Sequence, residues 1–321
     1  MIETDILSRL SFFSKSGKTD TLPYSRAVFA LGTFDGVHVA HRELLKKAGE
    51  LKKKTGADAL AVWCFSESPA RLLGRQNSES LTEKDEKVRL LLEYGADIVV
   101  MADFEDFRNV SAEDFINDIL RSSLFCIGTV CGFNHRFGKD GAGDSELLRK
   151  VFGRDRAVTV PKITLDGVTV CSSAIRSLLS AGKIEEANRM LGRSMSLTAE
   201  VKSGKRLGRT LGFPTANQVF PRDFVRLKHG VYATRCHVGK DIYFGVSNVG
   251  VRPSIDEGDD HIINCETYLI GFSGELYGQV ITVEFCEYLR EEMRFPSLDA
   301  LSSAIKKDSE RVVGYFNGKA K

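Results

Sequence analysis

The order of apolar runs along the chain is the feature that most restricts how it can fold. In the first 182 residues, runs rich in β-branched and aromatic residues alternate with amphipathic segments. The expected strand and helix segments are 26–31, 42–55, 57–65, 83–94, 96–102, 111–122, 124–133, 145–152 and 157–163. This alternation predicts βαβ units and a Rossmann-like, doubly wound parallel sheet. Ligands of such sheets bind beyond the carboxyl ends of the strands, so we expect a site in the loops there.

The pattern changes after Gly182. Residues 183–195 predict a short helical connector, and five closely spaced strand-like segments with glycine-bearing turns follow. These predict a small antiparallel barrel. The expected organisation is an α/β domain at 1–182, the connector, and an all-β domain at 196–321.

A terminal helix is expected after the barrel. Ser297 is a good N-cap, and the helical pattern runs to about Phe316. Leu298, Leu301 and Ile305 fall on one face of this helix.

Composition excludes several classes of protein. Lys and Arg number 45 against 43 Asp and Glu, a net charge of +2, which argues against a nucleic-acid binder. A hydrophobic fraction of 42% excludes a mostly disordered chain. The seven cysteines include no C-x-x-C pair, so we expect reduced, buried thiols. No run approaches the about 18 apolar residues that span a bilayer, and we expect a cytoplasmic protein without membrane contact.

A first candidate site follows the strand AVFAL. Gly32 ends the strand, and His38 and His41 lie three positions apart near the start of the next helix. A helix N-terminus presents free N–H groups and partial positive charge, which suit a polyphosphate, and two imidazoles add donors. The alternative is a zinc ion held by the two histidines, although no third ligand has a diagnostic spacing.

The run GTFDGVHVAH resembles the G-x-F-D-G-x-H-x-G-H signature of the nucleotidylyltransferase superfamily. In particular it resembles the FMN adenylyltransferase module of prokaryotic bifunctional riboflavin kinase/FAD synthetases. The segments LTEKDEKVRLLLEYGADIVV, GFNHRFGKDGAGD and CSSAIRSLL are similar to further elements of that module. The resemblance implies that one set of residues binds ATP and its phosphates and another stabilises charge during transfer: Gly32, Phe34, Asn134, Ser172 and Ser173 in the first set, His38, His41 and Arg176 in the second.

Physical chemistry agrees at the last of these motifs. Ser172 and Ser173 can cap a helix, and Arg176 lies one turn along on the same side. Together they offer hydroxyls, N–H groups and a guanidinium fork to one phosphate.

Four positions depart from the family pattern. Ala40 replaces a glycine, His135 an aromatic residue, Gly141 a common arginine and Cys171 a hydroxyl residue. We interpret these as drift around an intact His, Asn, Ser and Arg set, with a weakened or altered flavin subsite as the alternative.

A second candidate site lies in GRTLGFPTAN. Thr215 and Asn217 are two apart in an extended segment, so their side chains face the same way. A hydroxyl and an amide oxygen side by side suit Mg²⁺ held with nucleotide phosphates. With GVSNVGVRPS, ETYLIGFSGELYG and LREEMRF, the segment resembles the riboflavin kinase module of the same family.

That resemblance implies roles for individual residues. Thr215 and Asn217 would hold Mg–ATP, and Glu266 would be the general base for the flavin's ribityl 5′-hydroxyl. We expect partial burial to raise the pKa of Glu266. A phosphate-binding role for Gly212 and flavin contacts for three further residues are also implied: Asn248, Arg252 and Arg290.

The sequence therefore predicts a bifunctional enzyme. Riboflavin and ATP would give FMN, and FMN with a second ATP would give FAD and pyrophosphate, with Mg²⁺ as cofactor. The expected partners are these small molecules, with no nucleic acid, and the expected assembly is a monomer or weak homo-oligomer. The alternatives are one retained activity beside a degenerate domain, and a non-catalytic flavin- or nucleotide-binding regulator.

Overall fold

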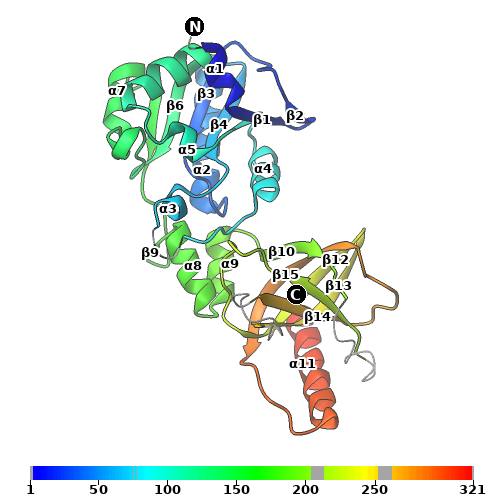
Figure 1. Cartoon of the computed structure of the whole chain (residues 1–321). Helices are drawn as coiled ribbons and strands as arrows, with labels where there is room; N and C mark the ends of the chain where they lie inside the picture. Colours follow the sequence, from blue (N-terminus) through cyan, green and yellow to red (C-terminus); the bar gives the residue numbers. More distant parts are fainter. Residues whose placement is uncertain (1–2, 75, 77, 204–212, 252–261, 320–321) are drawn as a thin grey trace. The chain divides into compact units, whose positions relative to one another are not determined.

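The chain divides into two compact units, residues 1–174 and 175–321 (Figure 1). The computed structural model describes residues 3–74, 76, 78–203, 213–251 and 262–319. The borders predicted at residues 182 and 195 stay predictions.

The first unit is built on a seven-stranded sheet with the order β2-β1-β5-β4-β3-β6-β7. The strands are β1 (Leu10–Ser14), β2 (Gly17–Thr19), β3 (Ala27–Leu31), β4 (Ala59–Phe65), β5 (Ile98–Ala102), β6 (Cys126–Gly132) and β7 (Ala157–Val160). Strands β3 to β7 are parallel, and the chain winds outward from β3 in both directions. The order therefore reverses between β3 and β6, and ligands of open α/β sheets bind at such a switch point.

Helices cover both faces of this sheet, which confirms the doubly wound prediction. One face carries α2 (Val39–Thr55) and α4 (Lys84–Glu93), while the other carries α5 (Phe104–Phe107), α6 (Ala112–Asp114), the π-helix η1 (Phe115–Ser123) and α7 (Ser145–Phe152). Along β3, Val28 and Ala30 pack against the face covered by α2 and α4. Phe29 and Leu31 pack against the opposite face. Burial on both faces explains the unbroken apolar run of this strand.

The remaining elements of the first unit are short. They are α1 (Glu3–Ser8), α3 (Pro69–Leu72), the 3₁₀ turn η2 (Lys139–Gly141) and the hairpin of β8 (Thr164–Leu165) and β9 (Val168–Thr169). Helix α8 (Ser172–Ser180) crosses into the second unit.

Two features of the first unit differ from the sequence prediction. Strands β1 and β2 form an antiparallel hairpin that adds to β5 at the sheet edge, where no strand was expected. The segment expected as one helix over 111–122 is a short α-helix that continues as the π-helix η1.

The second unit is a six-stranded antiparallel sheet with the order β10-β15-β12-β13-β14-β11. Its elements are α9 (Ile184–Leu191), β10 (Met195–Glu200), β11 (Thr215–Val219), β12 (Gly230–Val238), β13 (Asp241–Val251), β14 (Ile263–Leu269), β15 (Val280–Arg290) and α11 (Leu298–Lys319). The sheet curls until its edges meet, because Lys202 after β10 forms a β-bridge with Asn217 of β11. The predicted small antiparallel barrel is confirmed.

Helix α11 starts where the sequence predicted. The Ala300 N–H donates to Ser297 Oγ at 3.2 Å, so Ser297 is a genuine cap. The packing face differs from the predicted one: Leu298 is 54% exposed, while Val312 and Phe316, in the later turns, pack on the outer face of the sheet.

A row of hydroxyl groups crosses the buried inner face of the sheet. Ser247 Oγ lies 2.8 Å from Thr234 Oγ1 and 2.7 Å from Thr267 Oγ1, and all three residues are fully buried. They come from the neighbouring strands β12, β13 and β14. Ser247 therefore provides a hydrogen-bond partner for the buried hydroxyls of both Thr234 and Thr267.

We expect Ser247→Ala to lower the unfolding free energy of the second unit by about 1–3 kcal/mol, because two buried hydroxyls lose a partner. Native-state hydrogen exchange of the amides in β12 to β14 measures this change. Ser303→Ala, at an exposed position of α11, is the control and should stay within about 0.5 kcal/mol of the parent. Equal protection in both variants would contradict the prediction.

Candidate active sites

The loop after β3 is held by a buried acidic residue. Asp35 is 5% exposed, and its Oδ1 accepts the Leu81 N–H at 2.8 Å. Its carbonyl oxygen accepts the Ser172 hydroxyl at 2.9 Å, and the neighbouring Gly36 N–H donates to Thr82 Oγ1 at 3.3 Å. The loop is thus tied to the segment before α4 and to the start of α8.

Phe34 takes an unusual conformation in this loop. Its φ is 51°, in the left-handed region that non-glycine residues rarely occupy, and its ring is fully buried. The ring folds back over Gly32, where a Cβ atom would lie 3.1 Å from Phe34 Cε2. A side chain at position 32 would press on the Phe34 ring, so close packing favours glycine there.

The two histidines lie together at the start of α2. The helix begins at Val39, so His38 is its N-cap and His41 lies in its first turn. His38 Nδ1 accepts the His41 N–H at 3.4 Å, and the two rings stack with centroids 3.6 Å apart. His38 is 4% exposed.

Helix α8 begins at Ser172, so Ser172 and Ser173 are its first two residues. The residue just before the helix is Cys171, whose Sγ lies 3.2 Å from Ser173 Oγ. The predicted capping by the two serines is therefore wrong in detail, since they lie inside the first turn. Arg176 follows one turn after Ser172 and is 9% exposed.

Asn134 and His135 follow β6, on the other side of the switch point. Asn134 is exposed, with its Oδ1 3.6 Å from the place of a Cβ on Gly132. His135 is partly exposed as a residue, but its Nε2 is buried and has no hydrogen-bond partner among the described residues. Burial lowers the pKa of His135 to about 4, so its ring is neutral near pH 7.

In the second unit, three polar residues form one cross-strand row. Glu266 of β14 pairs directly with Asn217 of β11 on one side and with Asn248 of β13 on the other. Directly opposed residues in antiparallel strands have Cβ atoms about 5 Å apart and face the same side. The structure thus brings together three residues that are far apart in the sequence.

Glu266 is exposed in this structure. The partial burial expected from its apolar neighbours is therefore wrong, because those neighbours alternate onto the opposite face of the strand.

Thr215 and Asn217 line a cavity of about 280 Å³. The turn after β14, at residues 272–277, forms its other wall. Asn217 Nδ2 lies 3.5 Å from the Thr215 carbonyl oxygen, which leaves the amide Oδ1 facing the other way. Oxygen donors at the wall of a cavity fit the predicted magnesium site.

Two acidic residues of this unit have roles that the sequence analysis missed. Glu292 Oε1 accepts from Asn248 Nδ2 at 2.9 Å and lies where Gly250 has no side chain. Asp308 of α11 holds Arg290 through a bond of 2.7 Å to Nη2. Gly250 was the only sequence signal for the contact of Glu292 with Asn248. No sequence signal indicated the pairing of Asp308 with Arg290.

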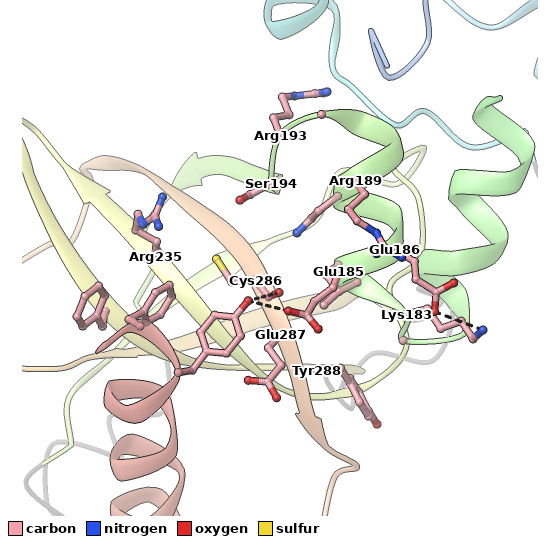
Figure 2. A pocket seen from close by; sticks show the side chains of 17 residues that line it. Lys183, Glu185, Glu186, Arg189, Arg193, Ser194, Arg235, Cys286, Glu287 and Tyr288 are labelled. Atoms are coloured by element: carbon pink, nitrogen blue, oxygen red, sulfur yellow. Dashed lines mark hydrogen bonds and ion pairs between the residues drawn. The ribbon is translucent and has the colours of Figure 1, made fainter. Parts of the chain in front are cut away.

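A larger cavity of about 1,040 Å³ lies elsewhere in the second unit, between α9, β15 and the end of α11 (Figure 2). Tyr315 in its wall donates to Glu185 and to the Cys286 carbonyl, both at 3.1 Å. None of the predicted site residues lines this cavity.

Several sequence expectations concern single residues or absences. Gly212 and Arg252 lie outside the described residues. All seven cysteines are free, and six of them are buried, as predicted. Across the described ranges, no group of three or more His, Cys, Asp or Glu residues could hold a metal ion. None of the helices described has the length and apolar character to cross a membrane.

Comparison with known proteins matches each unit to a separate family. The riboflavin kinase family model covers residues 191–316, and the FAD synthetase family model covers residues 22–174. The bifunctional riboflavin kinase/FMN adenylyltransferase of Bacillus subtilis is 31% identical over 91% of this chain and 93% of its own length. The chain belongs to the bifunctional riboflavin kinase/FMN adenylyltransferase family.

Two further proteins are similar over most of this chain. The Escherichia coli K12 protein is 34% identical over 92% of this chain and 94% of its own length. A crystal structure from Streptococcus pneumoniae, described as a macrolide-efflux protein, is 27% identical with a TM-score of 0.81. It covers 90% of this chain and 94% of that one, so the two share their fold.

We expect the buried imidazole of His135 to make the first unit less stable in mild acid. As the pH falls from about 6.5 towards 4, the unfolded chain gains a proton that the folded site does not take up, so the unfolding free energy falls by at most about 1.4 kcal/mol per pH unit. Melting temperatures of the parent and His135→Phe between pH 7 and 4.5 test this. The parent should lose stability more steeply, and parallel curves would contradict the prediction.

Proposed function

We propose that this chain makes FAD from riboflavin in two steps, one in each unit. The second unit phosphorylates riboflavin with ATP to give FMN, and the first unit transfers the adenylyl group of ATP to FMN with release of pyrophosphate. Both activities are those of the family to which the chain belongs. Two observations support the proposal: Asp35 ties the loop before His38 to Ser172 in the first unit, and Glu266 pairs with Asn217 and Asn248 in one row of the second.

The adenylyl transfer needs no nucleophile from the protein. The phosphate of FMN attacks the α-phosphate of ATP in line, and the protein's task is to position and neutralise charge. We assign that task to the stacked His38 and His41 at the start of α2 and to Arg176 on α8. Gly32, Phe34, Asn134, Ser172 and Ser173 are proposed to line the nucleotide site, since all but Asn134 belong to segments tied to Asp35.

In the kinase unit, Glu266 is proposed as the general base. Its carboxylate takes the proton of the ribityl 5′-hydroxyl as that oxygen attacks the γ-phosphate of ATP, whose bond to the bridging oxygen breaks to release ADP. Thr215 Oγ1 and Asn217 Oδ1 would hold Mg²⁺, because hard divalent cations bind oxygen donors and the two residues line one cavity. The ion would neutralise phosphate charge. Asn248 and Arg290 are proposed to face the flavin, with their side chains oriented by Glu292 and Asp308.

The further expectations about this protein stay predictions: a monomer or weak homo-oligomer, in the cytoplasm, without nucleic-acid partners. The departures at Ala40, His135, Gly141 and Cys171 keep open a reduced adenylyltransferase rate.

The two-site scheme predicts separate failures. His38→Asn retains a capping residue but loses the imidazole, and we expect FAD formation to fall about 10²–10³-fold with FMN formation unchanged. Glu266→Gln keeps the shape of an exposed side chain, and we expect FMN formation to fall about 10²–10⁴-fold while added FMN still gives FAD.

Chromatography of the flavins after incubation with riboflavin, ATP and Mg²⁺ measures both steps. FMN as the sole product of the parent would favour a degenerate first unit. Unchanged riboflavin would favour a regulator without turnover. Loss of both activities in either variant would contradict the two-site scheme.

The magnesium site can be tested by the metal dependence of each step. We expect Asn217→Ala to raise the Mg²⁺ concentration that half-activates FMN formation by about tenfold, because one oxygen ligand is lost. The Mg²⁺ dependence of FAD formation from added FMN should stay as in the parent. An unchanged requirement in FMN formation would exclude Asn217 as a ligand.

A further inference from the structure

Lys87 of α4 is a charged residue in the interior of the first unit. It is 4% exposed, and its Nζ donates to the Phe65 carbonyl oxygen at 3.1 Å. No carboxylate among the described residues lies within 4.0 Å of this ammonium group. Among the described residues, the buried ammonium group therefore has one neutral partner, the Phe65 carbonyl oxygen.

This arrangement is unfavourable for folding. An ammonium group loses its hydration on burial, and one carbonyl oxygen does not replace a counter-ion. Lys87 also lies in the first turn of α4, where the helix dipole is positive and disfavours cations. Its neighbours Val88, Leu90 and Leu91 are core residues, so an apolar side chain would suit the same place.

The location of Lys87 points to a role at the ligand edge of the sheet. Phe65 is the last residue of β4, and Trp63 is paired with Leu31 at the end of β3. Phe65 therefore lies level with the loop that begins at Gly32, one strand away, and neighbouring strands are about 4.8 Å apart. The segment before α4 is itself bonded to that loop, through Leu81 and Asp35.

We propose that the Lys87 ammonium supplies fixed positive charge to the phosphate groups bound at the adenylyl-transfer site. The missing counter-ion is the ligand: the triphosphate of a nucleotide or the pyrophosphate that leaves. The charge acts from the buried end of β4, next to the strand that leads into the loop, where low polarisability keeps its field less screened than in water. Lys87 also holds the carbonyl that ends β4, so the charge stays fixed relative to the loop. This inference rests on the proposed function of the first unit.

The test compares Lys87→Met with the parent in the full-length chain. Met preserves the length of the side chain and removes the charge, so we expect a higher melting temperature together with at least a tenfold rise in the KM for ATP in FAD formation. FMN formation by the second unit should be unchanged. Lys84→Met, which removes an exposed lysine from the same turn of α4, is the control and should leave the KM as in the parent.

Calorimetry with inorganic pyrophosphate gives a second readout that does not depend on turnover. We expect pyrophosphate to bind Lys87→Met at least tenfold more weakly than the parent and Lys84→Met. A lower melting temperature with unchanged KM and pyrophosphate affinity would show a purely structural lysine and overturn the inference. The parent distinguishes the two levels: a parent that forms no FAD and binds no pyrophosphate would refute the proposed site itself.

Discussion

The buried carboxyl group of Asp35 is the contact on which the first unit's site depends. The carboxylate accepts the Leu81 N–H, and the backbone carbonyl of the same residue accepts the Ser172 hydroxyl, so two distant segments are fixed to one loop. The loop between them contains Phe34 in a left-handed conformation, which isolated chain would avoid. The residues that follow Phe34 place His38 at the N-terminus of α2. The Asp35 side chain, which we assign no contact with substrate, thus fixes the position of the two imidazoles.

In the second unit, strand register places the polar residues of the site. Asn217, Glu266 and Asn248 face one side because they are directly opposed in three adjacent strands. On the opposite, buried face of β13 and β14 lies the hydroxyl row through Ser247, which continues onto β12. A slip of one residue would turn Glu266 inward and a core residue outward, so the packing of the interior and the placement of the polar row are one constraint.

Much of the fold could be predicted from periodicity, because buried positions require apolar residues and these recur at the spacing of the strand or helix. Strands such as β3 and β4 are apolar throughout, since helices cover both their faces. The hairpin of β1 and β2 was not predicted because β1 is only partly buried and β2, a strand of three residues, is largely exposed, so neither has an unbroken apolar run. Glu266 was predicted to be partly buried but is exposed, because its neighbours in the sequence point to the other face of the strand. The exposure of Leu298 depends on where α11 meets the sheet, which its own pattern does not contain.

The sequence by itself determined the two-part architecture, the alternation of strands and helices, and the residue types at both sites, because local spacing and composition encode them. The tertiary structure alone decided which of those residues meet. Pairing of Arg290 with Asp308 and burial of Lys87, with no carboxylate beside it among the described residues, follow from the packing of segments that are brought together only when the chain folds. Distances between such segments depend on the whole core, and no local pattern records them.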